Sequence, residues 1–197
     1  DVGHYPFSHA LEEIGAPHHE EVARPLITTG EVGDVLAEIA PDAPERVLAM
    51  IRGTSTSPLQ GLVSGSLDLD KIEYLKRDTL MCGVPYGTID ADRLINSLTV
   101  VADPQTGALR IGVLEKGLSA LESLLFAKYQ MYRNVYWHHA VRSATAMYKR
   151  LVDEALATAA LDVRELARLT DEALLHTLEQ RAPSPMLDAL RNRRLFK

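Results

Sequence analysis

The chain has 197 residues, a net charge of −6, 46% hydrophobic residues and 24% charged residues. These values are typical of a soluble globular protein with one domain, or one domain and a small appendage. The negative charge argues against a general affinity for nucleic acid or anionic membranes. No apolar segment approaches the roughly 20 residues of a membrane span. The single Cys82 excludes an intramolecular disulfide and fits a cytoplasmic, reducing environment, and we predict that it is a small buried residue.

The first twelve residues, Asp1–Glu12, hold two histidines and two carboxylates around a glycine and a proline. Because Gly and Pro weaken or break helices, we expect a turn that presents these side chains. Asp1 and His4 are three residues apart, as are His9 and Glu12, and on a helix such pairs share a face. This spacing allows Asp1 to bind a metal ion and Glu12 to orient His9. An ordinary terminal turn with solvated histidines is the alternative.

The same segment resembles the second half of the signature of HD-domain phosphohydrolases. In the branch that hydrolyses deoxynucleoside triphosphates, the signature reads H-D-x-G-H-x-P-F-S-H, and this chain matches it from the D onward. The resemblance therefore predicts that the chain is truncated inside the motif and lacks two metal-binding histidines. His19 and Glu20 resemble the His-Glu pair that follows the family signature, where the His lies beside the phosphates. A solvated first helical turn is the alternative for this pair.

A second informative segment is Leu67–Asp78. On a helix, its polar and amphipathic side chains occupy an arc of about 120°, formed by Asp70, Lys71, Tyr74, Arg77 and Asp78. A solvated helix face is one explanation. The segment also resembles the family pattern D-x-D-R/K-x-D-Y-x-x-R-D, followed by G-V-x-Y-G. The resemblance implies that Asp70 is the last metal ligand, that Lys71 contacts a phosphate, that Tyr74 packs beside the sugar and phosphates, and that Asp78 accepts a hydrogen bond from the sugar 3′-hydroxyl.

The remaining pattern predicts a mainly α-helical fold with one β-hairpin. Residues 98–102 and 109–114 are β-branched or alternating and flank a turn with Pro and Gly. From Glu115 to about Ala160 we expect continuous helix. On it, Tyr132, Tyr136 and His139 are spaced i, i+4, i+7 and should share one face. An aromatic core with a histidine at its edge is the alternative. The resemblance places Tyr136 under a deoxyribose and His139, where the family often has Lys, toward the phosphates.

The resemblance implies a metal-dependent HD-domain enzyme that hydrolyses a dNTP to deoxynucleoside and triphosphate. His9 and Glu12 would be the acid–base pair, and His4 and His19 would contact the phosphates. The metal would be one of Mn, Mg, Fe, Zn, Ni or Co. We expect residues 1–160 to form the HD domain without its N-terminal helices, and residues 161–197 to form a helical extension. The expected partners are a nucleotide substrate and further copies of the chain, with no membrane.

Two other functions remain open. One is a phosphatase or phosphodiesterase that acts on a nucleoside monophosphate or another phosphoester, which product analysis would distinguish because only the first reaction releases triphosphate. The other is a degenerate HD module that binds nucleotide as an effector or only builds an oligomer, and a bound metal ion in the longer natural chain would argue against it.

Overall fold

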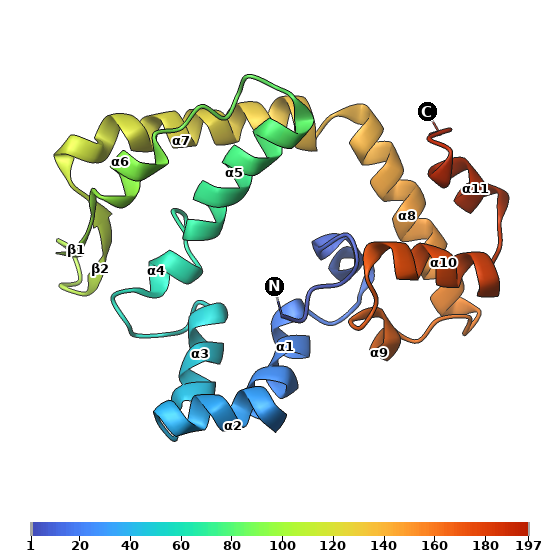
Figure 1. The fold of residues 1–197 in the computed structure, drawn as a ribbon, viewed down its shortest axis with the longest axis horizontal. Coiled ribbons are helices and arrows are strands. Elements are labelled where there is room, and N and C mark those ends of the chain that lie inside the picture. Colours follow the sequence, from blue (N-terminus) through green and yellow to red (C-terminus); the bar gives the residue numbers. More distant parts are fainter. Residues whose placement is uncertain (1, 197) are drawn as a thin grey trace. The chain divides into compact units, whose positions relative to one another are not determined.

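The computed structural model describes residues 2–196, and it is built mainly from helices with a single two-stranded hairpin among these residues (Figure 1). The predicted mainly α-helical fold is therefore confirmed. The chain divides into two compact units. The first consists of Asp1–Pro44 and His139–Lys197, and the second of Glu45–His138. None of the helices in the described part of the chain is both long and apolar enough to span a membrane.

Within residues 2–196, the longer elements of the first unit are helices. Its amino-terminal part contains a 3-10 helix, η1 (His9–Ile14), followed by α1 (His19–Thr28) and α2 (Gly30–Ile39). After the second unit, the chain continues with α8 (His139–Ala157), α9 (Val163–Leu166), α10 (Asp171–Arg181) and α11 (Pro185–Arg191). Helix α3 (Ala43–Ile51) starts at the boundary between the two units.

The core of the first unit joins residues from both ends of the chain. Leu11 of η1 packs in one cluster with Leu151 and Val152 of α8 and with Leu174 and Leu178 of α10. Helices α10 and α11 start at side-chain caps. The Thr170 hydroxyl accepts the N–H of Ala173, and the Ser184 hydroxyl accepts the N–H of Leu187. Residues 161–197 therefore pack against η1 and α8, while the predicted domain boundary at residue 160 stays a prediction.

The second unit contains α4 (Gln60–Val63), α5 (Leu69–Cys82), α6 (Ala91–Ile95), β1 (Leu98–Ala102), β2 (Leu109–Val113), a 3-10 turn η2 (Glu115–Gly117), α7 (Leu118–Met131) and a π-helical segment η3 (Tyr132–Tyr136). Its core is the seam between α5 and α7, where Ile72 and Leu75 pack with Leu124 and Met131. The strands pair antiparallel, with Leu98 opposite Val113, in agreement with the predicted hairpin.

Helix α5 has clear start and stop signals. The buried carboxylate of Asp68 accepts the N–H of Lys71 at 2.9 Å, which satisfies a free donor of the first turn. The helix ends at Gly83, whose φ of 64° is the left-handed conformation usual at such ends. The predicted helix over the second informative segment is thus present. Cys82 in the last turn is exposed, so the prediction that it is buried is wrong.

The expected continuous helix from Glu115 to Ala160 is divided. After α7 the chain widens into η3, where the N–H of Trp137 donates to the carbonyl of Tyr132, five residues earlier, at 2.8 Å. Helix α8 starts only at His139. Spacing of i, i+4 and i+7 therefore does not put His139 on one helical face with the two tyrosines, and His139 belongs to the other compact unit.

Candidate functional site

The turn that carries the first histidines is fixed from several sides. A Cβ atom on Gly3 would lie 2.4 Å from the carbonyl oxygen of His19, and Gly3 has a φ of +91°. The Tyr5 hydroxyl donates to the carbonyl of Pro17, and the buried Tyr148 hydroxyl of α8 donates to the carbonyl of Pro6, both at 2.9 Å. The contacts of Gly3 and Tyr5 hold the turn against the start of α1, and the bond from Tyr148 holds it against α8. His4, His9 and His19 therefore lie close together.

Glu12 is the centre of the histidine cluster. Its Oε1 lies 3.1 Å from Nδ1 of His9 and 2.9 Å from Nδ1 of His19, and it also accepts the backbone N–H of His19. Its Oε2 lies 3.1 Å from Nδ1 of His18. Burial would raise the pKa of Glu12, but the hydrogen bonds from His9, His19 and His18 outweigh it and lower the pKa to about 2. Glu12 is therefore a carboxylate that orients three imidazoles.

The predicted contact between His9 and Glu12 is present, and the contacts of Glu12 with His18 and His19 were not predicted. His18 and His19 are six and seven residues from Glu12, and a loop intervenes, so no helical or strand periodicity relates them. The catalytic roles expected for His9 and Glu12 stay predictions, since geometry alone does not show turnover.

His4 stacks on His19, with ring centroids 4.1 Å apart, and meets His9 edge-on at 4.8 Å. Its Nδ1 is buried and has no hydrogen-bond partner in the described part of the chain. Burial, together with the nearby charges of His19 and His9 when they are protonated, lowers the pKa of His4 to about 4. His4 is thus neutral at pH 7 in the free protein, and a charged role beside phosphates would require its pKa to rise when an anion binds.

The second unit brings together tyrosines and a carboxylate. The Tyr136 hydroxyl of η3 donates to Oδ2 of Asp78 on α5 at 2.7 Å. The Tyr136 ring lies 5.1 Å from that of Tyr132 and 6.3 Å from that of Tyr74, between centroids. Burial, followed by the bond to Asp78, raises the pKa of Tyr136, and burial beside Tyr132 raises the pKa of Tyr74. Both hydroxyls therefore stay protonated donors near neutral pH, and a π-helical turn is a frequent feature of functional sites.

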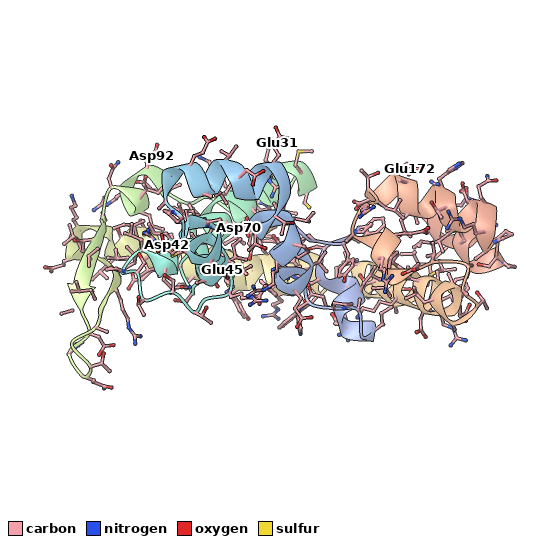
Figure 2. All side chains as sticks on the ribbon, turned by 90° about the horizontal axis from the view of Figure 1, so that it is seen from below. Glu31, Asp42, Glu45, Asp70, Asp92 and Glu172 are labelled. Atoms are coloured by element: carbon pink, nitrogen blue, oxygen red, sulfur yellow. The ribbon has the colours of Figure 1, made fainter. Side chains whose placement is uncertain are left out.

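The other predicted site residues lie apart from these groups. Lys71 turns back to the start of its own helix, where its Nζ pairs with Asp68 and donates to the carbonyl of Gly65 at 2.9 Å. Asp70, labelled in Figure 2, is exposed in the first turn of α5. His139 is exposed at the start of α8. Asp1 lies outside the described residues.

Within residues 2–196, one group of three potential metal-ligand side chains is close enough together to share an ion. His4, His9 and His19 each offer a nitrogen, and these atoms lie within 4.8 Å of one another. Asp70, the described one of the two carboxylates expected to bind metal, belongs to no comparable group of three His, Cys, Asp or Glu side chains among those residues.

A family model described as "HD associated region" matches residues 89–197, which is more than half of the chain. The chain belongs to this family. The matched HD-associated region includes the hairpin, α7, η3 and all of the carboxy-terminal helices, but not the histidine cluster.

The similar sequences are longer than this chain. An uncharacterised protein of Methanocaldococcus jannaschii is 35% identical over 198 residues, which is 100% of this chain and 41% of that protein. The uncharacterised protein YwfO of Bacillus subtilis is 33% identical over 79% of this chain and 35% of its own length. The deoxynucleoside triphosphate triphosphohydrolase SAMHD1 homolog of Dictyostelium discoideum is 26% identical over 100% of this chain and 42% of that protein. The chain thus spans less than half the length of these curated relatives.

Solved structures share the fold. A phosphohydrolase from Bacteroides thetaiotaomicron superposes with a TM-score of 0.77 at 24% identity, over 100% of this chain and 55% of that one. A hypothetical protein from Aquifex aeolicus gives a TM-score of 0.82 at 29% identity, over 99% of this chain and 54% of that one. The chain therefore shares its helical fold with these two solved proteins.

Proposed function

We propose that the protein to which this chain belongs is an HD phosphohydrolase, and that its substrate is a deoxynucleoside triphosphate. The observation that carries the proposal is the Glu12 carboxylate with its histidines, because a carboxylate-oriented imidazole is the usual side chain for moving a proton near neutral pH. The names of two similar proteins support the class, since one is a phosphohydrolase and another a deoxynucleoside triphosphate triphosphohydrolase.

The proposed chemistry of the first unit follows from the hydrogen bonds of Glu12. A carboxylate only accepts hydrogen bonds, so it holds a proton on Nδ1 of His9 and leaves Nε2 to take or give one. His9 would protonate the deoxynucleoside oxygen as it leaves the α-phosphate, or take a proton from the attacking water. His19, held by the same carboxylate, would donate to a phosphate oxygen that gains charge in the transition state.

The tyrosines of the second unit suit the sugar in this proposal. Tyr136 offers an aromatic face, and its hydroxyl is occupied by Asp78. Asp78 accepts from Tyr136 with one oxygen and has capacity left for a second donor, such as the sugar 3′-hydroxyl. A ring packed against C2′ would leave no room for a ribose hydroxyl, so the deoxy form would be preferred.

Metal dependence is part of the proposal, but no step is assigned to the ion. The resemblance implies that Asp1 and Asp70 bind the ion, and Asp70 belongs to no group of three potential ligand side chains among residues 2–196. Two carboxylates alone are a weak site for a transition metal, which binds better where imidazole contributes. The described residues near Asp70 therefore do not complete a site, and the proposed chemistry is limited to the side chains described above.

The products of hydrolysis test the proposal. The full-length protein is incubated with each dNTP, and the anions released are separated by ion chromatography. Inorganic triphosphate with deoxynucleoside supports the proposal, whereas orthophosphate or a nucleoside monophosphate would favour the phosphatase or phosphodiesterase alternative. No product with any nucleotide and any of the six metals would favour the non-catalytic module.

A substitution tests the sugar contact separately. Tyr136→Ala should lower the preference for dGTP over GTP, because it removes the ring that would exclude the 2′-hydroxyl. Tyr129→Ala is the control, since Tyr129 is exposed on the adjoining helix α7. An unchanged deoxy-to-ribo ratio in Tyr136→Ala would remove that role from Tyr136.

A further inference from the structure

The three imidazoles of His4, His9 and His19 are packed against one another. Their ring centroids lie 4.1 to 5.0 Å apart, and one nitrogen from each lies within 4.8 Å of the others. Tetrahedral coordination with metal–nitrogen distances of about 2.0–2.1 Å places ligand nitrogens roughly 3.3 Å apart. Small side-chain rotations would therefore bring the three rings around one ion.

The hydrogen bonds of Glu12 prepare two of the rings. Its Oε1 accepts hydrogen bonds from Nδ1 of both His9 and His19, so Nε2 of each neutral ring keeps its lone pair free. Histidines that bind metals usually donate their other ring N–H to a carboxylate, carbonyl or water in this way, which fixes the tautomer and raises the basicity of the ligand. The third ring, His4, has a buried Nδ1 with no hydrogen-bond partner among residues 2–196, and such a nitrogen is costly to leave unsatisfied.

We propose that His4, His9 and His19 form a binding site for a divalent transition-metal ion such as Zn²⁺, with Glu12 as the positioning residue behind two of the ligands. Three imidazole nitrogens favour Zn²⁺ over Mg²⁺, which prefers oxygen ligands. This site uses neither Asp1 nor Asp70, the carboxylates expected to hold the catalytic ion, so it would be a second metal site.

A consequence follows that rests on the proposed function. The proposed function assigns proton transfer to His9 and a phosphate contact to His19, and a ring nitrogen bound to a metal can do neither. Zn²⁺ at this site should therefore inhibit hydrolysis, and the nucleotide should compete with the ion.

Zinc binding by the full-length protein tests the site without any measure of activity. The metal present on isolation is counted first by elemental analysis, and Zn²⁺ is then titrated by equilibrium dialysis. The wild type should bind about one Zn²⁺ per chain more than His4→Asn or His19→Asn. Glu12→Gln should weaken this binding by roughly 10- to 100-fold, the usual effect of losing an outer partner. His176→Asn, which changes an exposed histidine of α10 outside the cluster, should bind Zn²⁺ within about twofold of the wild type.

Equal zinc binding by the wild type, His4→Asn and His19→Asn, with all three folded by circular dichroism, would overturn the proposal. The visible spectrum of Co²⁺ bound to the wild type decides the matter if a variant does not fold. Intense bands from a four-coordinate, nitrogen-rich ion support the site, and only the weak bands of an octahedral oxygen site would overturn it. Zinc binding without inhibition of a demonstrated hydrolase would overturn the competition with substrate and leave the metal site supported.

Discussion

Glycine at position 3 shows how closely the first turn approaches α1. A Cβ at Gly3 would meet the His19 carbonyl and, at 2.8 Å, the backbone nitrogen of Ala23. Gly15 has a similar φ of +94° but no atom within 4 Å of its would-be Cβ. A comparison of alanine substitutions at Gly3 and Gly15 therefore separates the free-energy cost of the backbone conformation from that of the steric overlap with α1.

Gly3→Ala should destabilise the protein more than Gly15→Ala. The conformational strain alone costs about 1–2 kcal/mol for a residue with Cβ, and Gly3→Ala adds an overlap with backbone atoms that cannot move aside. Urea unfolding of both variants beside the wild type measures the difference. Similar losses in the two variants would show that the turn shifts away from α1 easily.

His9 and Glu12 should act as one unit in catalysis. His9→Ala should lower kcat by roughly 10²-fold or more if His9 transfers the proton, and Glu12→Ala should lower it because the imidazole loses its orientation. The double variant should be little slower than His9→Ala, because residues that act together are not additive. Steady-state kinetics of the three variants measure this, with His176→Ala as the control. Losses that multiply in the double variant would contradict the coupling.

At the scale of single elements, the hairpin offers a test by pH. Oδ1 of Asp103 accepts the N–H groups of Thr106 at 3.0 Å and Gln105 at 2.9 Å. These bonds, with that from Thr106 as the larger cause, hold the pKa of Asp103 below its usual value. A pKa lowered by folding stabilises the folded turn above the unfolded pKa, near 3.9, and this stabilisation is lost as the pH falls through the folded pKa.

Amide exchange in the turn should therefore accelerate in acid. The N–H of Gly107 should lose protection, relative to the intrinsic rate, as the pH falls below about 4, because the turn opens more often. In Asp103→Asn the protection should not vary with pH in this range, since the amide does not titrate. Amides of α7 in the same samples are the control for global unfolding. Equal acid sensitivity in the wild type and Asp103→Asn would exclude Asp103 as the cause.

The sequence predicted the elements whose signals are local. The hairpin follows from a Pro- and Gly-containing turn between two β-branched runs, and α5 follows from the single helical arc that the polar side chains between Asp70 and Asp78 would share. The break after Met131 was not predicted, because side chains spaced four apart fit an α-helix as well as a π-helical turn. Tyr132 and Tyr136 are close in either case, which is why their pairing was predictable and the position of His139 was not.

The candidate site could be predicted only in part for a related reason. The pair of His9 and Glu12 lies within one short helical segment, so its spacing implies contact. The contacts of Glu12 with His18 and His19 depend on the hydrogen bond from Tyr5 to Pro17 and on the close approach of Gly3. These tertiary contacts have no periodic signal, and the burial that lowers the pKa of His4 depends on them as well.

At the scale of the whole molecule, the histidine cluster and the family match fall on different parts of the chain. The cluster belongs to the first unit and lies before residue 20, whereas the HD-associated match begins at residue 89. The core of the first unit nevertheless contains residues of both regions, with Leu11 packed against helices α8 and α10. Folding of the HD-associated helices therefore supports the element that carries His9 and Glu12.

The relatives are more than twice as long as this chain, so the metal is best tested in the full-length protein. Asp70 and Asp92 form a matched pair there, since both are exposed acidic residues in the first turn of a helix of the second unit (Figure 2). Asp70→Ala should lower the metal content on isolation by about one ion per chain and abolish hydrolysis, because loss of a carboxylate leaves an open site with weak affinity. Asp92→Ala should keep both the metal and the activity, because only Asp70 matches the ligand position of the motif.

Elemental analysis, with circular dichroism to verify folding, measures the outcome. An Asp70→Ala protein with its full complement of metal would remove Asp70 from the site, even if hydrolysis were lost.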